Sequence, residues 1–151
     1  MKAALVAGVL TVAAGGAAAD ELLFHTFSVH GHKRFFNDDG SSGVYNNTNL
    51  GVGWRTDGSY VLGAYYNSYR RPTVYAGRWL LWEVSESVQL GGWAALATGY
   101  KDYITRRELN VIGALTFRYS LGGGYSAYIS GVPRLGATDA VVNFTLGKEL
   151  R

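Results

Sequence analysis

Histidine residues near one end of a predicted strand are the first candidates for chemistry in this sequence. All three histidines lie in one short stretch, as His25, His30 and His32. His30 and His32 are two residues apart, so they share one face of an extended strand. Because imidazole exchanges protons near neutral pH, we predict that His30 acts as a general base, with His32 as a secondary candidate.

Two polar residues, Asn67 and Ser68, end a later segment and are expected at the same end of the molecule as His30. They would orient the base or bind a developing oxyanion, so the predicted catalytic set is His30, Ser68 and Asn67. One alternative to this catalytic set is a solvated cluster of polar side chains at the membrane interface that carries out no catalysis. A metal site on His30 and His32 is another, but no third ligand is evident, so we expect no metal and no cofactor.

Composition limits the classes of function. The chain has 151 residues, of which 48% are hydrophobic, 14% are aromatic and 17% are charged; 21 are Gly and none is Cys. This length predicts one domain, and the lack of cysteine excludes disulfides and thiolate metal sites. The formal net charge of +3 is too small and too scattered to indicate nucleic-acid binding.

The first 19 residues have the pattern of a secretory signal peptide. Lys2 precedes an apolar run that ends in the small residues Ala17, Ala18 and Ala19. The run is too short for a membrane anchor, and small residues fit a cleavage site. We therefore expect residues 1–19 to be removed on export, leaving 20–151 as the mature domain.

The mature chain alternates apolar residues with small or polar ones, which is the period of a β-strand. In one segment, for example, Leu50, Val52 and Trp54 share a face opposite to that of Asn49 and Arg55. Eight segments follow this pattern, at residues 24–34, 46–55, 59–68, 73–84, 87–98, 110–120, 125–132 and 140–148.

Connections between the segments also alternate. Short connections follow the second, fourth and sixth segments, whereas long polar connections, 35–45 and 99–109, follow the first and fifth. This asymmetry is typical of outer-membrane barrels. We predict an all-β fold, an eight-stranded antiparallel transmembrane β-barrel with short periplasmic turns and longer outer loops. The alternative is a soluble β-barrel that carries a ligand in the periplasm.

Aromatic residues cluster near the segment ends, as they do in the girdles of membrane barrels. The predicted girdle residues are Tyr45, Trp54, Tyr60, Tyr66, Tyr69, Trp82, Tyr100, Tyr119 and Tyr125. Basic residues in or beside the long loops would meet the phosphates of lipopolysaccharide, because guanidinium matches phosphate with paired hydrogen bonds. The predicted contacts are Arg70, Arg71, Arg106 and Arg107.

An eight-stranded barrel is too narrow for an open pore, so its lumen is filled by side chains or holds one small ligand. Gly51, Gly53 and Gly63 fall on the predicted inward faces. Missing side chains would leave room for an acyl chain, and we predict that these glycines line such a slot. The alternative is that glycine permits close packing and curvature in a tight barrel.

These motifs resemble a known family. The stretch FSVHGHKRF, followed by YNNTNLGVGWRTDGSYVLGAYYNSYRRPTVYAG, is similar to the lipid A palmitoyltransferase-like (PagP-like) outer-membrane barrels, and nearest to their shorter members, some of them carried by phages. The shared parts are a small-x-His unit at Ser28, Val29 and His30, a Gly-rich second strand, an Asp-Gly turn, and a third strand that ends in a polar-Ser pair. The resemblance is clearest over residues 28–80.

The resemblance implies an activity and its partners. Active family members move a palmitoyl chain from a phospholipid to lipid A at the outer leaflet, using a His, an Asp and a Ser. By position, His30 matches the His and Ser68 the Ser, but Asn67 stands where the Asp is expected and cannot carry a negative charge. The expectation is a monomeric acyltransferase with phospholipid and lipid A as partners. The alternative is a non-catalytic barrel of the same fold that modifies surface properties.

Overall fold

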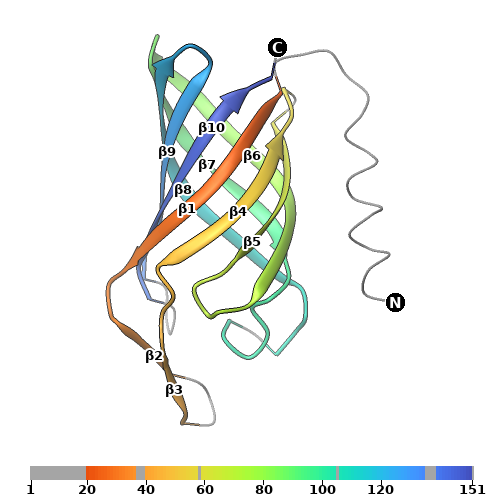
Figure 1. Ribbon diagram of the computed structural model, residues 1–151, viewed down its shortest axis with the longest axis vertical. Helices are drawn as coiled ribbons and strands as arrows, with labels where there is room; N and C mark the ends of the chain where they lie inside the picture. The colour runs from red at the N-terminus through yellow and green to blue at the C-terminus, as the bar shows by residue number, and fades with distance from the viewer. Residues whose placement is uncertain (1–19, 37–39, 58, 105, 135–138, 151) are drawn as a thin grey trace.

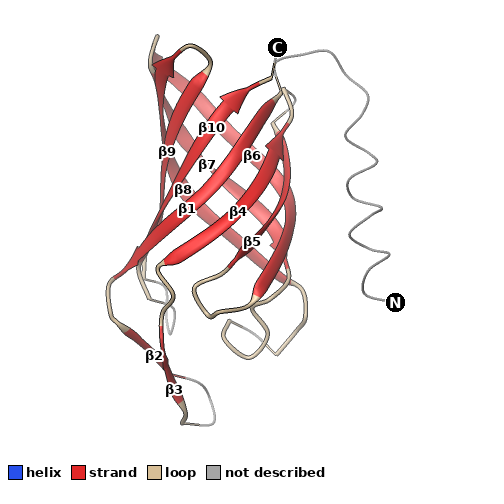
Figure 2. Ribbon diagram, viewed as in Figure 1, coloured by secondary structure: helices blue, strands red, loops and turns tan. Residues whose placement is uncertain are grey.

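β-strands follow one another along the whole of the described chain (Figure 1). The computed structural model describes residues 20–36, 40–57, 59–104, 106–134 and 139–150, so the predicted signal peptide lies outside the described residues. Figure 2 shows these residues as strands and loops. Within them, no helix is long and apolar enough to cross a membrane.

In the described residues, eight long strands form a closed antiparallel barrel in the order β1-β10-β9-β8-β7-β6-β5-β4. Their bounds are β1 Glu21–His30, β4 Thr48–Arg55, β5 Tyr60–Tyr66, β6 Pro72–Ser85, β7 Val88–Ala97, β8 Asn110–Gly122, β9 Tyr125–Val132 and β10 Val141–Glu149. The remaining strands, β2 (Arg34–Phe36) and β3 (Ser42–Val44), form a hairpin in the first long connection. In Figure 1 this hairpin extends from the lower rim of the barrel.

The eight predicted strands are confirmed, but the first is misplaced along the chain. Residues 24–34 were expected, whereas β1 covers Glu21–His30. Glu21 pairs with both Glu149 and Arg55 and so begins the strand earlier, and after His30 the chain leaves the sheet to reach the β2–β3 hairpin. The other strands differ from their predicted ends by at most two residues.

The asymmetry of the connections is also confirmed. Two to four residues join β4 to β5, β6 to β7 and β8 to β9, all at the barrel end where β1 begins and β10 ends. Longer connections occupy the opposite end, called the loop end below. The first of them, predicted as a loop at 35–45, contains the β2–β3 hairpin, because its short apolar segment Arg34–Phe36 finds a partner in Ser42–Val44.

The outer surface of the barrel is apolar. Leu50 is 65% exposed, Val111 is 73% exposed and Leu115 is 71% exposed, although a soluble barrel would bury such side chains. So continuous an apolar exterior fits a lipid environment.

The residues of the predicted aromatic girdle fall into two sets. Tyr60 and Trp82 are exposed near strand ends, as expected. Tyr45, Tyr69 and Tyr100 instead line the interior of the loop end, which corrects their assignment.

A buried ionic cluster fills the barrel end opposite the loops. The Glu21 carboxylate is fully buried and accepts two hydrogen bonds from Arg55, at 2.9 and 2.8 Å, and one from the Tyr128 hydroxyl. Arg118 donates to Tyr128 at 2.9 Å, and its Nη2 lies 3.4 Å from a carboxylate oxygen of Glu149. The cluster links five strands and closes the lumen at this end.

Breaking this cluster is expected to be costly, because removing Glu21 leaves the largely buried guanidinium of Arg55 without its carboxylate partner. Glu21→Ala should lower the free energy of unfolding by about 3–5 kcal/mol. The matched control is Glu108→Ala at the loop end, where the carboxylate pairs with Lys101 in solvent, and the loss should be below about 1 kcal/mol. Urea unfolding in detergent micelles measures both, and equal losses would contradict the structural role of the cluster.

Candidate functional site

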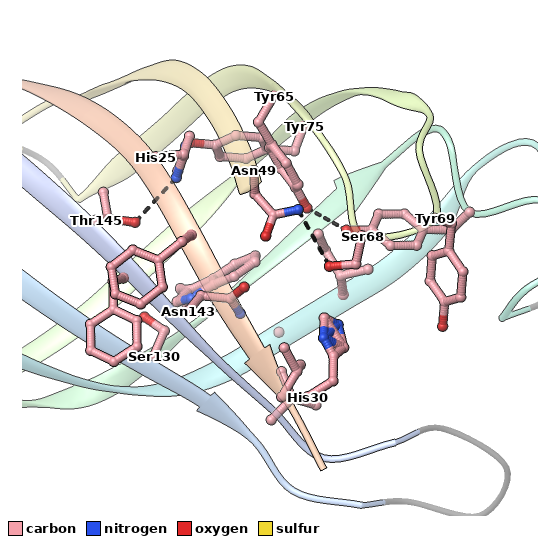
Figure 3. A pocket seen from close by; sticks show the side chains of 18 of the residues that line it. His25, His30, Asn49, Tyr65, Ser68, Tyr69, Tyr75, Ser130, Asn143 and Thr145 are labelled. Carbon is pink, nitrogen blue, oxygen red and sulfur yellow. Dashed lines mark hydrogen bonds between the residues drawn. The ribbon is translucent and has the colours of Figure 1, made fainter. Parts of the chain in front are cut away.

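A cavity of about 360 Å³ opens into the barrel from the loop end (Figure 3). This volume lies near the lower end of the range of roughly 300–1,000 Å³ that is usual for small-molecule sites. Aromatic side chains dominate its walls, and Tyr75, Trp79 and Trp93 lie deepest. Trp79 stacks on Trp93 and meets Tyr128 edge-on, with ring centroids 4.8 Å apart. The cavity therefore has a closed floor above the ionic cluster.

β8 and β9 pair over only part of β8 beside the cavity. The β8–β9 ladder starts at the Leu115–Gly131 pair, whereas β8 itself begins five residues earlier and pairs there only with β7 among the described strands. Val111 and Gly113, in the stretch without a β9 partner, line the cavity together with Val132 at the end of β9. A second, apolar groove, lined by residues of β1 and of β7 to β10, shares Val132 with the cavity. The cavity lining thus reaches the part of β8 that has no β9 partner among the described residues.

A β-bulge in β1 decides which of its side chains enter the lumen. The register of β1 shifts between His25 and Phe27 against both neighbouring strands. His25 and His30 are five residues apart and would point to opposite faces of a regular strand, but the extra residue brings both inside. His25 bonds Tyr75 Oη at 2.7 Å and Thr145 Oγ1 at 3.2 Å, deep in the barrel. The sequence pattern missed His25 because nothing in it marks the bulge.

Three polar side chains form a hydrogen-bonded cluster on one wall of the cavity. Ser28 donates to Asn49 Oδ1, and its hydroxyl lies 3.3 Å from the hydroxyl of Ser68. Asn49 Nδ2 also bonds Ser68 Oγ at 3.4 Å, as Figure 3 shows. Ser28 and Asn49 were not predicted as site residues. Each lies two residues before a predicted one, Ser28 before His30 and Asn49 before Gly51.

The predicted base, His30, lines the same cavity as Ser68. Its ring stacks on Tyr45, with centroids 3.9 Å apart and an angle of 19°. The His30 Nδ1 atom is buried and has no hydrogen-bond partner among the described residues. Figure 3 shows the side chains of His30 and Ser68 at the same cavity. A ligand group bound in this cavity would meet both side chains.

Asn67 is placed differently from its predicted partners. Its side chain is fully buried; Nδ2 donates to Thr73 Oγ1 at 3.0 Å and to the Gly99 carbonyl at 2.8 Å. Its Oδ1 accepts from the backbone amides of Tyr69 and Arg71, at 2.9 and 3.0 Å. These four bonds use the whole hydrogen-bonding capacity of the amide and fix the 67–71 turn. Asn67 therefore shapes the loop that carries Ser68 and does not line the cavity.

His32, the secondary candidate, lies at the rim and pairs with Asp139. Its Nδ1 is 2.9 Å from Asp139 Oδ1, and its backbone amide donates to Asp139 Oδ2 at 2.7 Å. The His32 side chain is 64% exposed and that of Asp139 10%. Although partial burial raises the pKa of Asp139, the hydrogen bonds from His32 outweigh it and hold this pKa below its usual value of 3.8.

The Asp139–His32 contact should persist to acid pH. A lowered carboxyl pKa means that the contact is complete above the usual value and is lost only as the pH falls through the lowered one. The amide NMR signals of His32 and Ala140, which both donate to Asp139, should therefore shift with a midpoint below pH 3.8. Asp139→Asn should abolish the shift, and a midpoint above 3.8 in the wild type would contradict the assignment.

The three glycines predicted to line a slot face the lumen but are covered. A methyl group at Gly53 would lie 2.4 Å from Tyr75 Oη, and one at Gly63 would lie 2.7 Å from the Tyr75 ring. At Gly51 the backbone of Tyr65 occupies the space. The lack of side chains here lets aromatic residues pack closely, in line with the alternative interpretation that glycine permits close packing. Other described residues line the cavity.

Gly63→Ala should therefore lower the free energy of unfolding, by about 1–3 kcal/mol, because the added methyl overpacks against Tyr75 and the Val52 carbonyl. Gly131→Ala is the matched control, since a methyl there meets no atom within 4 Å. Urea unfolding in detergent measures both variants. A Gly63→Ala variant as stable as Gly131→Ala would show that Tyr75 moves aside at little cost.

The four arginines predicted to contact phosphate all lie at the loop end. Arg70 and Arg71 belong to the 67–71 turn, and the Arg71 guanidinium lies 5.2 Å from the centre of the Tyr103 ring. Arg106 and Arg107 follow in the 98–109 connection. All four are exposed, so they give this end of the barrel positive charge.

The fold is similar to that of a solved transmembrane barrel. This structure, from work on the de novo design of transmembrane β-barrels, matches with a TM-score of 0.55 and 10% sequence identity, over 89% of this chain and 98% of the designed one. No family model and no curated protein matches the chain. The likeness supports the fold, a closed antiparallel β-barrel, and carries no function.

The geometry has a defined chemical capability. Among the described residues, the His30 imidazole has a nitrogen without a hydrogen-bond partner, and it lines a cavity that also presents hydroxyl and amide donors, Ser68 and Asn49. Such a combination suits proton transfer to or from a bound hydroxyl group and stabilisation of negative charge on an oxygen. Burial raises the pKa of Tyr45 above its usual 10, so its phenol stays neutral beside this base.

Proposed function

We propose that this protein is an outer-membrane barrel that takes an acyl chain of a membrane lipid into its loop-end cavity. The observation that carries the proposal is the shape of that cavity, an aromatic slot with a closed floor whose lining reaches the stretch of β8 that has no β9 partner among the described residues. A chain entering beside this stretch would leave the bilayer without crossing water. The closed floor excludes transport through the lumen.

We further propose acyl transfer from a phospholipid to lipid A as the chemistry. His30 would take the proton of a lipid A hydroxyl whose oxygen attacks the phospholipid ester carbonyl. Ser68 and Asn49 would donate hydrogen bonds to the resulting oxyanion. Collapse breaks the ester C–O bond, and the departing lysophospholipid oxygen receives the proton from His30. The exposed arginines at the loop end would hold the lipid A phosphates.

A second candidate is a barrel of the same fold that binds lipid without catalysis. It is favoured by one observation. Asn67 stands where the PagP-like enzymes that the sequence resembles have an acid, but its side chain makes its hydrogen bonds within and beside the 67–71 turn and not with His30. In that case the loops and the cavity would alter the outer surface through binding alone.

Mass spectrometry of lipid A decides between these candidates. Expression in a bacterium that lacks its own lipid A palmitoyltransferase should add one acyl chain to lipid A. His30→Ala should reduce the rate at least about a hundredfold, the usual contribution of a general base. His32→Ala, whose side chain lies at the exposed rim, is the matched control and should retain most of the activity.

Both proteins must first be recovered folded in the outer membrane, as judged by heat-modifiable migration on gels. Wild-type protein that is folded and inserted but adds no acyl chain would overturn the transferase proposal and leave the lipid-binding barrel. Recovery in the soluble fraction without detergent would overturn both.

A further inference from the structure

A carboxylate lies beside the proposed base although the strand motif lacks one. Asp139 lines the same cavity as His30, from the connection between β9 and β10. Barrel closure brings it there, because His30 pairs with Val141 and the amide of Gly31 donates to the Ala140 carbonyl at 2.9 Å. Asp139 Oδ1 lies 2.9 Å from the position that a methyl at Gly31 would take. The carboxylate thus sits against the backbone between His30 and His32.

The orientation of Asp139 is fixed by three hydrogen bonds. Its Oδ2 accepts from the His32 amide, while Oδ1 accepts from the Ala140 amide at 2.9 Å and contacts the His32 ring. Two of these donors are backbone amides, so the carboxylate holds its place whatever the ring of His32 does. Gly31 has no side chain that would push it away from the cavity.

Among the described residues, His30 has few other charged neighbours. The groups near it are the neutral phenol of Tyr45, stacked on its ring, and the hydroxyl and amide groups of β1 and β4 that line the same cavity. His32, on the far side of Asp139, is partnered by that same carboxylate. Within the part of the chain that the structure describes, Asp139 is therefore the carboxylate whose charge acts on the base.

We infer that Asp139 is the acidic positioning residue of the site, whose charge stabilises His30 after it has taken a proton. This inference rests on the proposed acyl transfer. It replaces the carboxylate that Asn67 cannot supply with one from a different loop. When the lipid A hydroxyl gives its proton to His30, the new positive charge lies near the Asp139 carboxylate, and it disappears when the proton passes to the departing lysophospholipid.

The first test observes His30 directly and needs no activity. In protein labelled with ¹⁵N-histidine and held in micelles, the imidazole of His30 is titrated by NMR and identified by its absence in His30→Ala. In Asp139→Asn the titration midpoint should move about one pH unit lower than in wild type. Asp102→Asn makes the same change in another connection at the loop end and should leave the midpoint in place. An unchanged midpoint in Asp139→Asn would overturn the inference.

The second test follows acyl transfer against pH with the folded variants. Asp139→Asn should lower the rate about tenfold, the effect of one pKa unit on a base, and move the acid limb of the profile to lower pH. Asp139→Glu should restore both in part. A loss of rate with no displacement of the limb indicates a structural role only and overturns the inference.

The two tests separate this inference from the proposed function. If the wild-type protein transfers no acyl chain, the transferase proposal fails while the titration still decides whether Asp139 acts on His30. If Asp139→Asn does not fold, Asp139→Ser removes the same charge with a smaller side chain and gives the same readout.

Discussion

Pairing of β1 with β10 is the constraint on which the rest of this molecule depends. An open eight-stranded sheet in lipid would leave two edges of unpaired amides and carbonyls, and closure removes both. Because β1 also pairs with β4, it forms the centre of the functional wall. On one side it faces Asn49, and on the other it draws Asp139 toward His30. The candidate site is thus assembled from segments that lie far apart in the chain.

The bulge in β1 is the second determinant of the site. One extra residue in the strand reverses the inward and outward assignment of every residue after it. As a result Ser28 and His30 enter the lumen together with His25, and Val29 points toward lipid. The same strand therefore supplies a buried histidine to the core and a more accessible one to the cavity, with different partners for each ring.

The part of this structure that could be predicted is the part set by the residue pattern within each strand. Alternation of apolar and polar residues is set strand by strand, so eight strands, their two faces and the loop asymmetry followed from the sequence. The placement of Tyr75 over Gly53 and Gly63, and of Asn67 in its turn, depends on which strands become neighbours after closure. The β1 bulge, and with it the position of His25, leaves no mark in the pattern. Asp139 lies in a connection with no strand period, and only the fold brings it beside His30.

The ionic cluster below the cavity has an electrical consequence. Glu21 and Glu149 carry two formal negative charges, and Arg55 and Arg118 carry two positive ones, so the group sums to zero. A neutral arrangement of close charges has a field that fades over a short distance, whereas a single charge acts at long range. The cluster therefore adds little to the potential inside the cavity, whereas Asp139 lines it as an uncancelled charge. A charged headgroup that approaches the loop end would respond to Asp139 and to the exposed arginines there, and hardly at all to the four charges beneath the aromatic floor.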